Sequence, residues 1–126
     1  MASDDLYRRL RAICLRFPEV RETLSWGNPT FKAGTRNFAI LDSYRGERCL
    51  CFKATVAEQR RLCREKRFFV APYIGRQGWT CLRLDGRVPW KRAERLVEES
   101  YRQVAPPALV EALDRRLRRR VRRDVP

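Results

Sequence analysis

Three strand-like segments follow one another between residues 30 and 54, and the short turns that join them constrain the fold more than any other feature. The strands are predicted at residues 30–33, 37–43 and 48–54. The turns between them contain Gly34 and Gly46 and are too short to hold the helical crossover that parallel strands require. The region is therefore predicted to be an antiparallel meander whose middle strand is apolar on both faces.

Apolar residues at helical spacing flank this meander on both sides. Helices are predicted at residues 3–17, 55–64 and 90–104, and from about Ala108 onward. Two further strands are predicted at residues 68–70 and 79–84, and residues 19–24 are predicted to be a polar connector. The predicted fold is α+β in two layers: a five-stranded antiparallel sheet with helices packed on it, in the order α-β-β-β-α-β-β-α-α. The helix of residues 90–104 is expected to pack on the sheet.

The chain of 126 residues is long enough for one domain with one core. We predict an α+β domain of residues 1–114 and an arginine-rich helical extension of residues 115–126. The extension holds seven arginines and one aspartate, which contributes +6 to the total net charge of +14. Basic runs of this density are typical of nucleic-acid binding. One alternative is that this end is solvated and contacts nothing specific. For the arginines elsewhere, the alternative is the composition bias of a GC-rich genome, which raises the arginine content of its proteins.

A segment rich in glycine and aromatic residues, APYIGRQGW at residues 71–79, is predicted to be an irregular loop between two strands. Gly75 and Gly78 permit backbone angles that other residues avoid, while Tyr73 and Trp79 carry large rings with a polar group. In one interpretation the rings fill the core. In the other, the loop holds Arg76 toward an anionic ligand.

The chain contains no histidine, which removes the commonest general base and the commonest metal ligand. Its five cysteines include no Cys-x-x-Cys pair, and we interpret all five as small buried residues in a reducing cytosol. The carboxylates are scattered. We therefore expect no enzymatic activity, no metal, no cofactor and no disulfide.

No apolar run is long enough to span a bilayer, and the N-terminal residues MASDD lack the layout of a secretory signal. The expected protein is a cytoplasmic monomer without a membrane partner.

Three blocks of the sequence resemble the MmcQ/YjbR family. They are SWGNPTFK at residues 25–32 with Phe38-Ala39 after it, the segment at residues 71–79, and SYRQVAP at residues 100–106; PEV at residues 18–20 also fits. The match covers roughly residues 5–113, with the blocks in family order. The motif residues are Trp26, Pro29, Phe31, Pro72, Tyr73, Gly75, Gly78, Trp79 and Tyr101.

The resemblance implies a compact two-layer α+β domain with a double-wing, CyaY-like fold. The family is described as DNA-binding, with no established enzymatic activity and no cofactor. The arginine-dense end beyond Leu113 departs from the family pattern.

The candidate nucleic-acid contacts are basic residues in the turns, on one strand, in the loop and at the C-terminal end. They are Lys32, Arg36, Arg45, Arg76, Arg115, Arg116, Arg118, Arg119, Arg120, Arg122 and Arg123. Trp26, Pro29 and Phe31 are either a platform for bases or packing residues, with Trp26 and Phe31 closing the junction of the first helix and the sheet. Tyr101 lies on the apolar stripe of its helix and is predicted to be structural.

These features favour a protein that binds nucleic acid, with duplex DNA expected, through phosphates and with low sequence specificity. A protein-interaction or chaperone-like module that uses the doubly apolar strand is the alternative. A binder of small anions at residues 73–79 is a third hypothesis.

Overall fold

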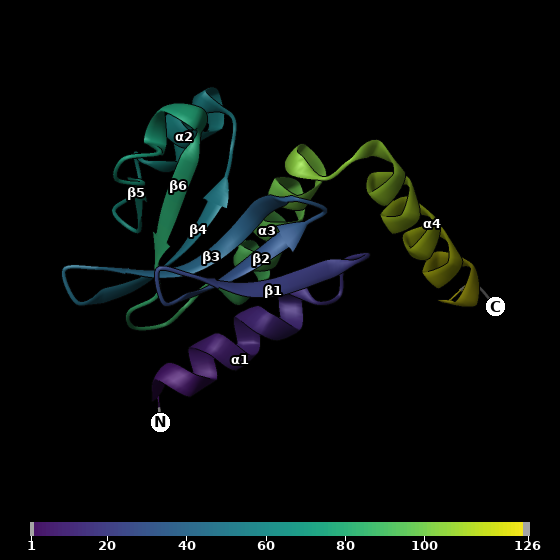
Figure 1. The fold of residues 1–126 in the computed structure, drawn as a ribbon, viewed down its shortest axis with the longest axis horizontal. Coiled ribbons are helices and arrows are strands. Elements are labelled where there is room, and N and C mark those ends of the chain that lie inside the picture. Colours follow the sequence, from purple (N-terminus) through teal and green to yellow (C-terminus); the bar gives the residue numbers. More distant parts are fainter. Residues whose placement is uncertain (1, 125–126) are drawn as a thin grey trace.

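A computed structural model describes residues 2–124 of the chain, with side chains from residue 5 onward. The elements in chain order are α1 (Ala2–Cys14), β1 (Val20–Ser25), β2 (Asn28–Ala33), β3 (Arg36–Tyr44), β4 (Glu47–Lys53), α2 (Val56–Leu62), β5 (Phe68–Val70), the 3-10 turn η1 (Gly75–Gln77), β6 (Trp79–Arg83), α3 (Trp90–Val104) and α4 (Pro107–Asp124). The strands form one sheet in the order β1-β2-β3-β4-β6-β5, and every neighbouring pair is antiparallel. The prediction of an α+β fold with an antiparallel sheet and four helices is confirmed (Figure 1).

The predicted number of five strands is wrong, because the segment read as a polar connector is strand β1. β1 pairs with β2 along its whole length, from Val20 opposite Ala33 to Ser25 opposite Asn28. Its central residue Glu22 is polar and half-buried, and its carboxylate accepts hydrogen bonds from Tyr7 and Arg11 of α1. Because the residue that faces α1 is polar, the sequence of β1 lacks the alternation of apolar and polar residues by which a strand is predicted.

The main core lies between one face of the sheet and the helices α1 and α3. Phe17, Phe38 and Tyr101 meet there, with ring centroids 4.9 to 5.9 Å apart. Tyr101 is fully buried, and its hydroxyl donates a hydrogen bond to the carbonyl oxygen of Pro18 at 2.8 Å. Val97 of α3 is also fully buried, so the prediction that α3 packs on the sheet and the structural interpretation of Tyr101 are both confirmed.

A serine of α3 completes the ladder between β3 and β4. Their register ends with Ala39 opposite Phe52, so Phe38 and Lys53 would form the next pair. Instead, the buried Ser100 hydroxyl lies between them. It donates to the Phe38 carbonyl oxygen at 2.6 Å and accepts from the Lys53 backbone N–H at 2.9 Å. The helix is therefore joined to both strands by one side chain.

A second, smaller core lies on the opposite face of the sheet. Its buried members are Cys49, Cys51, Ala71, Trp79 and Cys81, with Ile40, Tyr44 and Phe69 packed at its edge. The segment from Ala71 to Gly78 closes one end of this core. Gln59 of α2 holds the segment in place, since its side-chain amide donates to the carbonyl oxygens of Gly75 and Trp79 at 2.9 and 2.8 Å.

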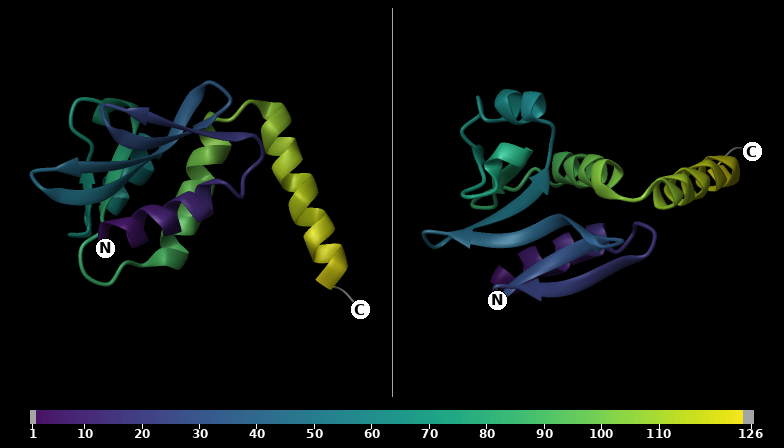
Figure 2. Two further views of the ribbon diagram at one scale, coloured as in Figure 1. Left: turned by 60° about the horizontal axis from the view of Figure 1, so that its bottom comes forward. Right: turned by 45° about the horizontal axis from the view of Figure 1, so that its top comes forward.

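α4 begins against the domain and then extends away from it (Figure 2). Leu109 and Leu113 are buried, Leu117 is half-buried, and every residue from Arg118 to Asp124 is exposed. The Arg102 guanidinium of α3 joins the helix to the domain through Asp114, at 2.9 Å. The helix is continuous from Pro107 to Asp124.

Candidate nucleic-acid interface

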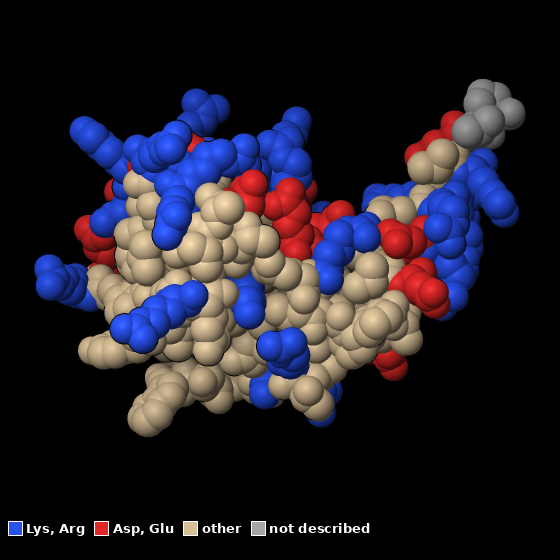
Figure 3. Space-filling view, turned by 90° about the horizontal axis from the view of Figure 1, so that it is seen from above, with Lys and Arg blue, Asp and Glu red and all other residues tan. Residues whose placement is uncertain are grey.

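The exposed arginines of α4 form the densest group of predicted contact residues. They are Arg115, Arg116, Arg118, Arg119, Arg120, Arg122 and Arg123, and all seven are exposed. At about 100° per residue, these side chains fall within an arc of about 200° around the helix. The remaining arc holds Leu113, Leu117 and Val121. In the space-filling view, basic side chains line the outer edge of α4 on the right, with acidic and uncharged side chains beside them (Figure 3). We call this group the α4 arginine surface.

One of these arginines also joins α4 to the turn that follows α1. Arg116 donates a hydrogen bond to the carbonyl oxygen of Arg16 at 2.9 Å. A cavity of about 350 Å³ lies between α4, α1 and α3, with Phe17 and Leu113 among its apolar walls and Arg120 at its edge. The N-terminal half of the α4 arginine surface is therefore anchored, and its C-terminal half stands in solvent.

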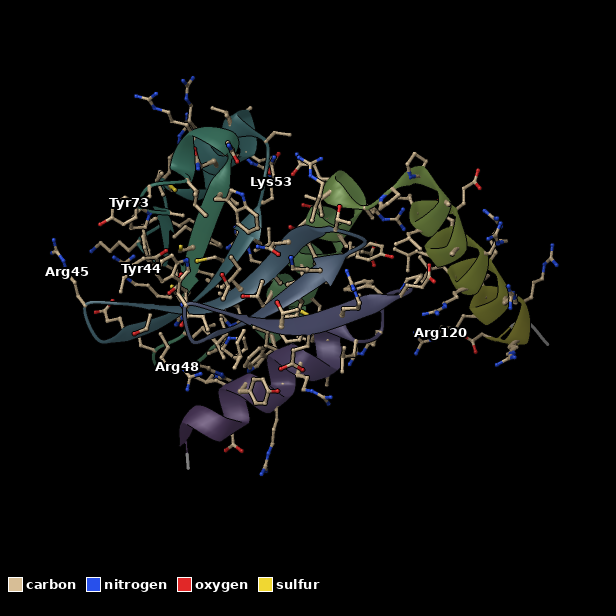
Figure 4. All side chains as sticks on the ribbon, viewed as in Figure 1. Tyr44, Arg45, Arg48, Lys53, Tyr73 and Arg120 are labelled. Carbon is tan, nitrogen blue, oxygen red and sulfur yellow. The ribbon has the colours of Figure 1, made fainter. Side chains whose placement is uncertain are left out.

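The other predicted basic residues lie apart from one another. Arg36 begins β3 beside the turn at Gly34, which approaches Pro106 at the start of α4. Arg45 occupies the turn at the other end of β3, remote from α4 (Figure 4). Lys32 is half-buried in β2, and Arg76 is exposed on η1. The structure thus places Arg36 at the same end of the molecule as α4. Arg45 and Arg76 lie elsewhere and do not join the α4 arginines in one surface.

The loop at residues 71–79 is irregular, as predicted, but its two aromatic residues differ. Trp79 is buried in the second core, whereas Tyr73 is fully exposed. Gly78 has φ +96°, and a β-carbon there would lie 1.9 Å from the Ala54 carbonyl oxygen, so only glycine fits. Gly75 is buried against Val70, and Pro72 is half-buried.

The block at residues 25–32 does not form an aromatic platform. Trp26 is exposed at the tip of the β1–β2 hairpin, with φ +53°, so the prediction that it closes the junction of α1 and the sheet is wrong. Phe31 is fully buried in the main core, as predicted, and Pro29 is half-buried in β2. The rings of Trp26 and Phe31 lie in different environments because Trp26 is part of the two-residue turn between β1 and β2, whereas Phe31 lies within β2.

A cavity of about 600 Å³ lies at the end of the sheet remote from α4, and no sequence pattern had predicted it. Its walls come from three separate segments: Tyr44, Arg45, Glu47, Phe69, Pro72, Tyr73 and Arg83. Figure 4 shows Tyr44, Arg45 and Tyr73 grouped at this end. The Arg83 guanidinium already has partners within the protein. It lies over the Phe69 ring, 4.6 Å from the ring centroid, and donates a hydrogen bond to the Lys66 carbonyl oxygen. Arg45 is exposed at the rim.

The five cysteines are free thiols, and four of them are buried. Cys63 is half-buried, where burial raises its pKa. Cys49, Cys51 and Cys81 lie together in the second core. Hydrogen bonding with Cys51 and Cys81 lowers the pKa of the Cys49 thiol, whereas hydrogen bonding with Cys49 raises the pKa of Cys51, so the group favours a first thiolate at Cys49.

β3 is apolar on both faces because each face meets a core. Leu41 lies in the main core, and Ile40 and Tyr44 pack on the second core. The pattern that suggested a protein-interaction or chaperone-like module is thereby explained by packing within the domain. In residues 2–124, no helix is both long and apolar enough to cross a bilayer.

Comparisons with known proteins agree with this fold. The crystal structure of protein DR2400 from Deinococcus radiodurans, which is described as a DUF419 domain, superposes with a TM-score of 0.66. The two chains are 21% identical over 83% of this chain and 85% of that one, so the likeness is one of fold. A comparison with curated proteins found no match. A family model described as YjbR matches residues 15–103, which is more than half of the sequence, and the chain therefore belongs to the YjbR family.

Proposed function

We propose that the protein binds nucleic acid, with duplex DNA as its partner, through phosphate contacts made by the α4 arginine surface. The observation that supports this proposal is the exposure of all seven arginines on a helix that leaves the domain. Guanidinium groups form bidentate hydrogen bonds with phosphate oxygens, and clustered arginines draw in polyanions. α4 carries three carboxylates, Glu111, Asp114 and Asp124, against these seven arginines, and Asp114 is already paired with Arg102.

The shape of α4 suits a duplex. The major groove of B-DNA is about 12 Å wide and admits an α-helix. Arginines on an arc of about 200° point to both sides of a helix lying in such a groove, so they reach phosphates of both strands. Contacts of this kind fix position without reading bases, so we expect low sequence specificity. No enzymatic activity is proposed.

The test is the salt dependence of binding to one duplex. Each phosphate contact contributes about 0.9 to the slope of log affinity against log salt. We expect glutamine at Arg118, Arg119, Arg122 and Arg123 together to reduce that slope by about 2 to 3.6, because up to four contacts are lost. Glutamine retains helix propensity, which keeps α4 intact.

A matched control removes the same charge elsewhere. Arg8, Arg60, Arg64 and Arg87 are exposed and lie on α1, on or after α2, and before α3. Their combined change to glutamine is expected to alter the slope by less than about 1. Equal losses in the two variants would mean that total charge, rather than α4, governs binding.

The same titration with single-stranded DNA and with RNA tests the choice of partner. Tighter binding to either would contradict the assignment to duplex DNA. If the intact protein fails to bind any of the three at about 50 mM salt, the nucleic-acid proposal is wrong.

A further inference from the structure

We propose that Cys49, Cys51 and Cys81 form a three-thiolate site for a single thiophilic d10 cation, Cu⁺ or Zn²⁺. The three sulfur atoms lie within 4.8 Å of one another, and all three residues are buried. The site is independent of the α4 arginine surface, which lies at the other end of the sheet.

Strand pairing assembles these thiols. Cys49 and Cys51 are two residues apart on β4 and therefore face the same side of the sheet. Cys51 stands directly opposite Cys81 of β6 in the antiparallel register. The sequence does not show this group, because Cys81 is distant along the chain and no Cys-x-x-Cys spacing marks it. The strand register fixes the backbone positions of the three cysteines before any ion arrives, and only their side chains need to adjust.

The sulfur positions are close to those that one ion requires. With metal–sulfur bonds of about 2.3 Å, three thiolates in a plane lie about 4.0 Å apart. Cys49 Sγ and Cys51 Sγ are 3.9 Å apart, which matches. Cys51 Sγ and Cys81 Sγ are 2.7 Å apart and must separate by about 1.3 Å, a change within reach of side-chain rotation.

The surroundings favour a soft ion with few ligands. Ala71 and Trp79 are buried in the same cluster as the thiols, and Ile40 and Phe69 pack at its edge, so apolar side chains flank the sulfur atoms. Thiolates select Cu⁺ and Zn²⁺ over harder cations. The chain contains no histidine, so the sulfur atoms meet no competing imidazole.

A counter-charge and an entry route are also present. Arg83 of β6 stands opposite Cys49 and brings a positive charge that it shares with Glu47 at 3.5 Å, while Asp42 of β3 stands opposite Cys49 on its other side. Tyr44 and Phe69 pack on the second core and also line the cavity of about 600 Å³ described above. Because these two rings belong both to the second core and to the cavity wall, their rotation is the entry route that the proposal requires.

The experiment is a metal titration of the intact, reduced protein under anaerobic conditions. Zn²⁺ and Cu⁺ are added in separate arms, each against a chelator of known affinity for that ion, and Cd²⁺ serves as a probe of thiolate charge-transfer absorbance. We expect one equivalent per chain by native mass spectrometry, with release of thiol protons on binding. The arm that retains its ion against the stronger chelator identifies the preferred cation.

Substitutions distinguish the cluster from the other thiols. We expect C49S, C51S and C81S each to weaken binding at least 100-fold, and C63S to leave it unchanged, since Cys63 lies outside the cluster. Circular dichroism checks the fold of each variant, and alanine replaces serine where a serine variant is unfolded. Equal binding by C81S and the unaltered protein would overturn the proposal.

The 2.7 Å contact also allows a different outcome, in which the Cys51 and Cys81 thiols are oxidised to a disulfide. Alkylation of protein taken directly from cells, followed by mass measurement, counts the thiols that are free or metal-protected. A Cys51–Cys81 disulfide in that sample, together with no retention of Zn²⁺ or Cu⁺ after reduction, would contradict the metal site.

Discussion

Replacement of Ser100 with alanine removes a hydroxyl group that joins α3 to two strands. The Phe38 carbonyl loses a donor at 2.6 Å and the Lys53 N–H loses an acceptor at 2.9 Å. A buried polar group left without a partner costs about 1 to 3 kcal/mol. Phe38 is fully buried and Lys53 half-buried, so we expect the free energy of unfolding to fall by about 2 to 4 kcal/mol.

Urea titration followed by circular dichroism measures this change. For a domain of 126 residues, the expected loss corresponds to a decrease in Tm of about 8 to 15 °C. The control is Glu99→Ala on the same helix, because Glu99 is exposed and the substitution leaves both backbone groups paired. A decrease below about 0.5 kcal/mol in Ser100→Ala, comparable to that of a surface substitution, would refute the reasoning. It would mean that β3 and β4 close directly on each other once the hydroxyl is absent.

Three further predictions concern the glycine loop, Tyr101 and Trp26. Gly78→Ala places a β-carbon 1.9 Å from the Ala54 carbonyl oxygen and is expected to cost about 3 kcal/mol or more in thermal unfolding. Gly46→Ala, where no atom lies within 4 Å, is expected to cost about 1 kcal/mol, and equal effects would contradict the steric argument. Burial raises the pKa of Tyr101 from 10.0 to about 12, so the unfolded chain loses this proton first as the pH rises. Stability is therefore expected to fall between pH 10 and 12, and to fall less steeply in Tyr101→Phe; identical slopes would contradict this. Trp26→Ser is expected to change the free energy of unfolding by less than about 0.5 kcal/mol, since the ring is exposed, and a loss above about 1 kcal/mol would show a packing role.

Local patterns in the sequence were enough to predict most of the fold. The meander of β2, β3 and β4 follows from short glycine turns between apolar segments, and the stripe of α3 follows from its helical spacing. These signals are local, because side-chain periodicity and turn chemistry depend on neighbouring residues. The sequence also determined the strong positive charge of residues 115–126, whatever their position in the fold.

Only the tertiary structure decided how distant residues combine. β1 is a strand because β2 pairs with it and α1 satisfies Glu22, and neither partner is visible in its own six residues. Trp26 is exposed because a hairpin turn carries it away from the core. The three-cysteine cluster exists because β6 lies beside β4, which brings Cys81 next to Cys51. Such pairings depend on strand register and topology, which local sequence patterns do not determine. The candidate thiol site was therefore found only in the tertiary structure, whereas the arginines of α4 were predicted as contact residues from the sequence.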